Sequence, residues 1–344
     1  MSGSNESILP LRPRGGVPVR LARYVRRSVL PALRLSDRPF TLETPARAGT
    51  RSSLWLLKGT GIPPLLVRLF RNRRGAARNA RALHHLEVLS LPAPRLAYHR
   101  AGLPLPLPAG CGAGGCITVE TWIEGRPIES LRNTREWEPA VLKIARLLGR
   151  FRDIRRSRWG PPGSWQPFTY ARTALWRMRR MVRTLAARGL LNAAEARQAR
   201  RGFLRWRSVL SNLTSFSLSH RDAHPENFVL TASSQVVPVD LHRLCYAPFQ
   251  EEIFNALHHV DPAVPGLGQR FLDCYFAGDG AQARRQFEAT RGFFEPFYFL
   301  KRLHRWALLP QPPLHDPRLA PWRRAVAAVE PPGHGAGALH TDLS

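Results

Sequence analysis

The chain has 344 residues, of which 52 are Lys or Arg and 24 are Asp or Glu, so its formal net charge at pH 7 is +28. At this length a chain usually divides into more than one compact core, and a hydrophobic content of 44% suffices for globular interiors. No apolar stretch of about 18 residues and no secretory signal pattern is present. The sequence therefore predicts no membrane-spanning helix, a cytoplasmic location and anionic surroundings.

Residues 1–36 form a basic arm punctuated by proline and glycine. Within it, residues 17–34 place arginines among leucines and valines, at Arg20, Arg23, Arg26, Arg27 and Arg34. A basic amphipathic segment of this kind can lie peripherally on an anionic membrane surface, where each arginine contributes about 1 kcal/mol. A solvated helix that packs on the following domain is an equal alternative, and both interpretations stay open.

Residues 37–125 are predicted to be mostly β-structure with one helix. Apolar runs predict strands over 41–44, 53–57, 65–70 and 116–124, the last running into Gly125, and a helix over 76–89. The small residues of the turn 48–53 are a weak candidate for a phosphate-cradling loop, and an ordinary hairpin turn is an equal alternative. Prolines and glycines over 103–115 predict a loop.

Residues 126–330 are predicted to be mainly helical. Residues 172–207 form two arginine-rich helices that break at Gly189, and residues 331–344 are predicted to be a disordered tail. The cysteines lack the paired spacing of a metal site, so free thiols in a reducing compartment are expected at Cys111, Cys116, Cys245 and Cys274.

The most informative segment is 219–227, with the sequence SHRDAHPEN, followed by Asp240 in VVPVDLHR. His-Arg-Asp with Asn five positions after the Asp is the spacing of a kinase catalytic loop. On this pattern Asp222 is the catalytic base, and Asn227 and Asp240 hold Mg²⁺. The apolar runs 228–230 and 236–239 predict a short hairpin that carries Asp240.

The loop is similar to those of aminoglycoside phosphotransferases and of lipopolysaccharide core kinases, which phosphorylate heptose or Kdo sugars. The sequence DLHR after Val239, with 254–257 and 266–276 downstream, resembles the second family more closely. The resemblance covers roughly residues 40–310 and is specific over 218–243. It implies an α+β, bilobal protein-kinase-like fold with a mostly β small lobe (37–125) and a helical large lobe (126–330). It also implies ATP and Mg²⁺ as cofactors.

The same resemblance assigns roles upstream, where the sequence departs from the kinase pattern. Arg68 takes the place of the lysine that binds the nucleotide phosphates, and Asn79 takes the place of its glutamate partner. Lys58 ranks below Arg68 as an alternative cation, and Glu87 is expected to be a surface residue. Glu120 and Trp122 lie in the strand that runs from Cys116 into Gly125, where adenine would hydrogen-bond the backbone between the two lobes. Arg68, Glu120 and Trp122 are the predicted nucleotide contacts, and a core position is an equal alternative for Trp122.

Three functions stay open. The favoured one is an ATP-dependent kinase for a sugar hydroxyl of the lipopolysaccharide inner core, with this anionic glycolipid and an anionic membrane surface as partners. An aminoglycoside-type phosphotransferase would need an acidic pocket for its cationic substrate, which the arginine-rich large lobe does not favour. A catalytically weak pseudokinase is suggested by Arg68 and Asn79. No nucleic-acid-binding motif is present, so no specific nucleic acid is expected.

Overall fold

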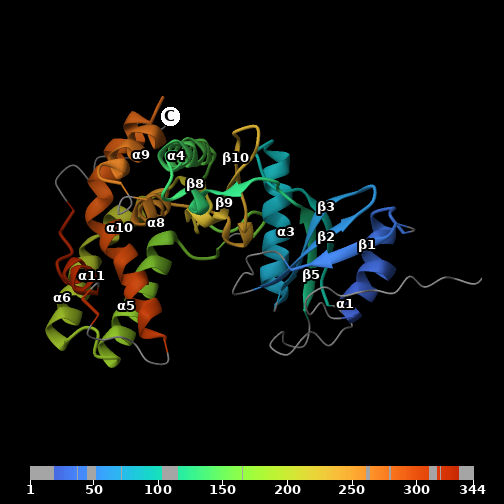
Figure 1. Cartoon of the computed structure of the whole chain (residues 1–344). Helices are drawn as coiled ribbons and strands as arrows, with labels where there is room; N and C mark the ends of the chain where they lie inside the picture. The colour runs from blue at the N-terminus through green and yellow to red at the C-terminus, as the bar shows by residue number, and fades with distance from the viewer. Residues whose placement is uncertain are drawn as a thin grey trace, which may run out of the picture. The chain divides into compact units, whose positions relative to one another are not determined.

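The computed structural model describes residues 19–36, 38–44, 52–70, 72–102, 115–164, 166–260, 264–278, 280–309, 316–317 and 319–332. The chain divides into two compact units (Figure 1). The first unit comprises Met1–Gly125 and Thr231–His242, and the second unit comprises Arg126–Leu230 and Arg243–Ser344. Residues 231–242, which we predicted within the large lobe, group with the first unit.

The first unit is built on a five-stranded antiparallel sheet with the strand order β1-β2-β3-β5-β4. The strands are β1 (Phe40–Glu43), β2 (Ser52–Gly59), β3 (Ile62–Phe70), β4 (Leu96–Arg100) and β5 (Cys116–Thr121), and the helix after β3 is α3 (Arg73–Val88). The predicted strands and helix are therefore confirmed. Gly61 turns the chain between β2 and β3 at a φ of 68°, in the left-handed region that favours glycine.

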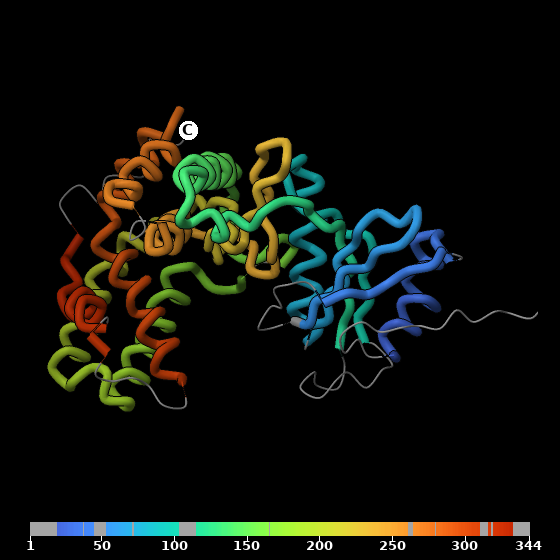
Figure 2. The backbone as a smooth tube through the Cα atoms, in the orientation of Figure 1, coloured from blue at the N-terminus to red at the C-terminus, as the bar shows by residue number. Residues whose placement is uncertain are grey.

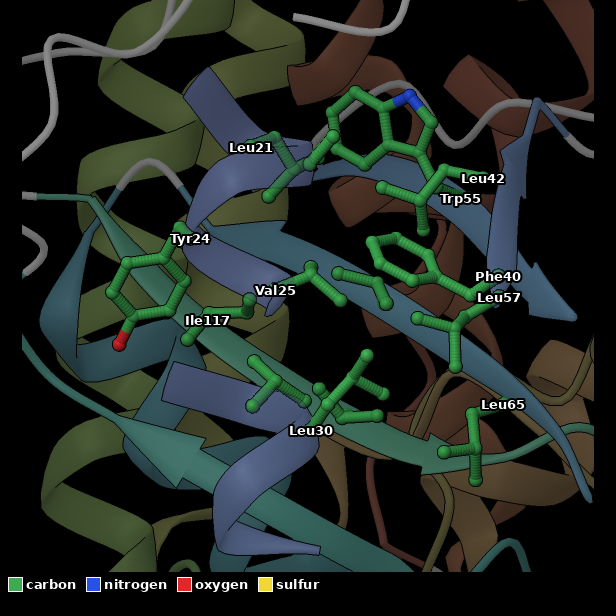
Figure 3. Packing of buried hydrophobic residues seen from close by; sticks show 14 of the residues in the cluster. Leu21, Tyr24, Val25, Leu30, Phe40, Leu42, Trp55, Leu57, Leu65 and Ile117 are labelled. Carbon is green, nitrogen blue, oxygen red and sulfur yellow. The ribbon is translucent and has the colours of Figure 1, made fainter. Parts of the chain in front are cut away.

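The two faces of this sheet carry different side chains because successive residues of a strand point to opposite sides. One face is apolar and packs against α1 (Val19–Tyr24), the π-helical turn Val25–Val29 and α2 (Leu30–Ala32). Figure 3 shows Leu57, Leu65 and Ile117 of this face, to which Val67 also belongs. The opposite face holds Arg68 and is covered by α3.

The helical segment of the N-terminal arm packs on this sheet, which decides between the two interpretations of residues 17–34. Leu21, Val25 and Leu30 are buried in the core, whereas the five arginines of the segment remain exposed. The apolar side of the helix is thus already covered by protein, and the prediction that it rests on a membrane is wrong for that side. Residues 19–32 belong to the core of the first unit.

The second unit is mainly helical (Figure 2). Its helices are α4 (Trp137–Asp153), α5 (Tyr170–Ala187), α6 (Ala193–Arg205), α7 (Arg207–Ser211), α8 (Gln250–Val260), α9 (Leu267–Tyr275), α10 (Ala281–Ala307) and α11 (Leu319–Ala327). Helix α10 contacts α5, α8 and α11. Its Phe293 and Phe297 pack against Phe203 of α6, with ring centroids 5.5 and 6.2 Å away. The predicted break between the arginine-rich helices is confirmed, because Gly189 follows α5 at a φ of 70°.

Short strands frame the predicted catalytic loop. In the second unit β8 (Phe216–Ser219) pairs with β7 (Arg155–Arg156) and β11 (Cys245–Ala247), and β9 (Phe228–Leu230) pairs with β6 (Arg126–Pro127). The other strand of the predicted hairpin is β10 (Val236–Pro238), and the turn before it is closed by the Thr231 amide, which donates to Gln235 O at 3.0 Å.

Several predicted features lie outside the described residues, namely most of the turn 48–53, residues 103–114 with Cys111, and residues 333–344. Cys245 and Cys274 are free thiols, as predicted. Within the described ranges, no helix is both long and apolar enough to cross a membrane.

Candidate active site

The loop after β8 presents Asp222 and Asn227 together. The Asn227 side chain donates from Nδ2 to the backbone oxygen of Asp222 at 2.8 Å, and the His224 amide donates to the same oxygen at 2.8 Å. A short 3₁₀ turn, Pro225–Asn227, completes the loop. These bonds direct the amide nitrogen of Asn227 inward, which leaves its carbonyl oxygen as the atom suited to a metal ion.

The Asp222 carboxylate is held by two basic side chains. Arg243 donates from Nη1 to Asp222 Oδ1 at 2.9 Å, and His224 Nε2 lies 3.5 Å from the same oxygen. Burial acts to raise the pKa of Asp222, but the hydrogen bond to His224 and the charge of Arg243 outweigh it and lower the pKa to about 2. The carboxylate is therefore ionised at neutral pH, where it can orient a hydroxyl and accept its proton only late in the transfer.

His224 also lies against a second histidine, with the two rings tilted by 43°. Its ring centroid lies 3.6 Å from that of His259, which belongs to α8. Burial, followed by the neighbouring His224, lowers the pKa of His259 to about 3. A neutral imidazole can lie against the basic side of the loop without adding charge to it.

Backbone strain marks Arg221 in the loop and Asp240 in the first unit. Arg221 has a φ of 67° and Asp240 a φ of 59°, a region that side-chain-bearing residues seldom occupy. Such strain persists where surrounding contacts impose it, and it concentrates at functional sites. Arg221 is held by two glutamates of α8, since its amide donates to Glu252 Oε1 at 3.0 Å and its guanidinium pairs with Glu251 at 2.7 Å.

The predicted phosphate-binding cation lies in a buried charge network of the first unit. Arg68 donates from Nη2 to Glu120 Oε1 at 3.1 Å and from Nη1 to Asp240 Oδ1 at 2.9 Å. Asn79 of α3 donates to the other oxygen of Glu120 at 3.1 Å. Burial acts to lower the pKa of Arg68, but the charges of Glu120 and Asp240 outweigh it and raise the pKa, so the guanidinium stays charged.

The Asp240 carboxylate contacts the buried Arg68 guanidinium and is itself partly exposed to solvent. Its Oδ1 meets both Arg68 and His242 Nδ1, the latter at 2.8 Å, while one third of its side chain is exposed. The carboxylate of Asp240, in the first unit, and the amide oxygen of Asn227, in the second unit, are each a hard oxygen donor of the kind that Mg²⁺ takes with phosphate oxygens and water. Each of the two residues is thus by its own chemistry suited to Mg²⁺, which would neutralise phosphate charge during transfer. Within the described ranges, no group of three His, Cys, Asp or Glu could hold a metal alone.

The structure separates the other candidates from this network. Lys58 is half exposed and pairs with Glu43 at 3.1 Å on the surface of the sheet, and Glu87 is exposed on α3. The backbone amide of Trp122 donates to Pro64 O at 2.9 Å, so this N–H group already has a hydrogen-bond partner within the first unit. The nucleotide contacts predicted for Arg68, Glu120 and Trp122 stay predictions, as do the roles of Asp222, Asn227 and Asp240.

Sequence reasoning missed two sets of partners. Glu120 was assigned to the hinge, although the pairing of β3 with β5 places its carboxylate beside Arg68. Glu251 and Glu252 were not singled out, although two adjacent acids inside an apolar helix pattern are unusual, because buried carboxylates need partners.

Comparison with known proteins identifies the family and the fold of the chain. The model of the phosphotransferase enzyme family matches residues 43–289, which is more than half of the chain. No curated protein sequence matches. An aminoglycoside phosphotransferase APH(4)-Ia variant, solved with ADP and hygromycin B, superposes with a TM-score of 0.56 at 14% identity, covering 89% of this chain and 97% of that one.

Two further solved structures are similar. The ethanolamine kinase of Plasmodium vivax has a TM-score of 0.53 at 14% identity over 89% of this chain and 86% of its own. An amicoumacin kinase with AMP-PNP and Ca²⁺ has a TM-score of 0.52 at 15% identity over 90% and 95% of the two chains. The fold is thus the α+β kinase-like fold, and the family match makes the protein a phosphotransferase. It belongs to the phosphotransferase enzyme family.

Proposed function

We propose that the protein transfers the γ-phosphate of ATP, with Mg²⁺, to a sugar hydroxyl of the lipopolysaccharide inner core. The observation that carries the kinase part is the loop in which Asn227 braces the backbone of an ionised Asp222. Asp222 would orient the acceptor hydroxyl and take its proton, while Asn227 and Asp240 would hold Mg²⁺. Arg68 would contact the phosphates.

The charge of the second unit supports an anionic acceptor. Helix α5 contains no acidic residue, and its exposed arginines are Arg172, Arg177, Arg179, Arg180 and Arg183. A cationic aminoglycoside would be repelled by this surface, whereas a phosphorylated glycolipid would be attracted to it. The DLHR sequence at 240–243 adds the resemblance to the core kinases.

The same helix is our proposed contact with an anionic membrane surface. Phe168 and Trp176 are 50% and 57% exposed beside the arginines, and the Arg172 guanidinium lies 4.3 Å from the centroid of the Phe168 ring. Aromatic rings and arginines together suit the interface of an anionic bilayer. Binding to anionic vesicles should fall as salt rises, because exposed charges are screened beyond about 8 Å at physiological ionic strength.

Vesicle sedimentation tests this surface. Trp176→Ser combined with Arg179→Gln should weaken binding to anionic vesicles and leave ATP binding unchanged. Val88→Ser, at an exposed apolar residue of the first unit, is the matched control. If the protein binds neutral and anionic vesicles equally, the proposal that the arginines of α5 contact an anionic membrane is wrong.

The kinase function is tested by turnover and nucleotide affinity. Asp222→Asn should lower turnover by roughly 10²–10⁴-fold with little change in fold, whereas Asp240→Asn should weaken binding of MgATP. Asp273→Asn, at an exposed carboxylate paired with Arg284, should change neither quantity. Unchanged phosphorylation by the first two variants would refute the assignment, and a wild-type protein without Mg²⁺-dependent nucleotide binding would indicate a pseudokinase.

The acceptor is tested separately. Mass spectra of core oligosaccharide from cells with and without the gene should differ by phosphate on a core sugar. Purified protein should phosphorylate dephosphorylated core oligosaccharide and not an aminoglycoside. The reverse preference would replace the lipopolysaccharide proposal by an antibiotic-type phosphotransferase.

A further inference from the structure

The buried network around Arg68 departs from the arrangement in which a helix glutamate pairs with the phosphate-binding cation. The side chains of Arg68 and Glu120 are 6% and 3% exposed, and Asn79 is almost fully buried. Both oxygens of Glu120 accept hydrogen bonds within this group. The carboxylate that faces Arg68 within this group is therefore that of Glu120, a residue of strand β5 and not of helix α3.

Strand register explains why Glu120 can reach Arg68. Arg68 of β3 lies opposite Thr118 of β5. Residues two apart on a strand point to the same side, and diagonal cross-strand neighbours lie within reach of long side chains. Glu120 therefore meets Arg68 through the hydrogen bonding of the sheet itself, and the pair does not depend on the position of α3.

The residue on α3 must then be neutral. A glutamate at position 79 would place a second carboxylate against Glu120 in a buried site, where like charges repel strongly. Asparagine instead donates a hydrogen bond to the carboxylate. The Arg68 fork also fits this arrangement, because its two terminal nitrogens serve Glu120 and Asp240 at once, which the single nitrogen of a lysine cannot do with the same geometry.

We propose that Glu120 is the positioning residue for Arg68, supplied by the sheet in place of the helix glutamate, with Asn79 as its neutral support. The inference rests on the proposed role of Arg68 at the phosphates. The carboxylate that pairs with the phosphate-binding cation is thus on β5 here, whereas the kinase pattern has it on the helix that corresponds to α3. Arginine at position 68 and asparagine at position 79 therefore maintain the site and do not mark its decay. Glu120 keeps Nη2 of Arg68 fixed. Nη1 of Arg68 can then give up its hydrogen bond to Asp240 and donate to a phosphate oxygen of the nucleotide instead.

The first test measures ATP binding when the carboxylate is removed from position 120 and when a carboxylate is placed at position 79 instead. Glu120→Gln should weaken ATP binding by roughly 10- to 100-fold, by analogy with the loss of affinity or activity when the outer partner of a metal ligand is removed. The double variant Glu120→Gln with Asn79→Glu returns the carboxylate to α3 and should recover most of that loss. Glu43→Gln, which removes an exposed cross-strand pair with Lys58, should leave ATP binding unchanged.

Affinity is measured by calorimetry with ATP, with and without Mg²⁺, and turnover is measured beside it. A positioning role predicts a larger change in the KM for ATP than in turnover, whereas general loosening of the fold would lower both. Unchanged affinity in Glu120→Gln, or no recovery in the double variant while both proteins unfold cooperatively, would overturn the proposal.

A second measurement separates this inference from the proposed function. If wild-type protein binds no ATP, the kinase proposal fails, and the charge network is then judged by thermal unfolding alone. Glu120→Gln should unfold at a lower temperature than wild type, and adding Arg68→Met should restore part of the loss because the uncompensated cation is removed. Equal unfolding temperatures for wild type and Glu120→Gln would then refute the role of Glu120.

Discussion

Glu251 is the acid whose loss should affect stability most in the second unit. Its side chain is 3% exposed and lies 2.7 Å from both Arg221 Nη1 and Lys301 Nζ, and it accepts a hydrogen bond from the Tyr170 hydroxyl at 2.5 Å. Burial acts to raise the pKa of Glu251, but its two cations outweigh burial and hold the pKa far below the usual range. Glu251→Gln keeps the volume of the side chain and removes this charge.

The magnitude follows from what the substitution leaves behind. Breaking a buried ion pair from one side costs about 3–5 kcal/mol because the partner stays buried without its counter-charge. The side chains of Arg221 and Lys301 are 19% and 30% exposed, so we expect the lower end, about 3 kcal/mol. At roughly 2–4 °C per kcal/mol for a unit of this size, the unfolding temperature should fall by about 6–12 °C.

Scanning calorimetry at pH 7 measures this shift. Glu295→Gln is the matched control, because its pair with Arg291 on α10 is partly exposed, at 33% and 51%, and should contribute about 0.5 kcal/mol or less. Turnover of Glu251→Gln should also fall, since Arg221 directly precedes Asp222 and its strained backbone is held by α8. Equal unfolding temperatures for Glu251→Gln and Glu295→Gln would refute the reasoning.

Three further outcomes are expected. Burial raises the pKa of Glu252 from 4.5 to about 7, so its contribution to stability is full below about pH 4.5 and is lost as pH rises through 7; Glu252→Gln should flatten thermal stability between these pH values. Gly149→Ala would place a Cβ 2.8 Å from Tyr275 O, so denaturant unfolding should show a loss of about 1–3 kcal/mol. Arg243→Gln should raise the pKa of Asp222 above 2, which would move the acid limb of the turnover profile upward.

The fold was predictable where the signal is local. The apolar run over 65–70 and the helical pattern over 76–89 predict β3 and α3, because periodicity depends on neighbours along the chain. The position of residues 19–32 was not predictable, because a basic amphipathic helix suits a bilayer and a sheet equally well. The choice depends on whether an apolar sheet face is available, and here the odd-numbered side chains of β3 supply one.

In the candidate site, too, the local sequence predicts some residues and not others. The spacing from Asp222 to Asn227 predicts chemistry because one short loop holds both residues. The restraint on that loop comes from α8, where Glu251 and Glu252 reach Arg221 from about thirty residues further along the chain. Strain at Arg221 is a cost of about 1–3 kcal/mol that the glutamates offset. A sequence motif can therefore indicate the reacting groups, while the residues that keep those groups in place become visible only when the helix packs against the loop.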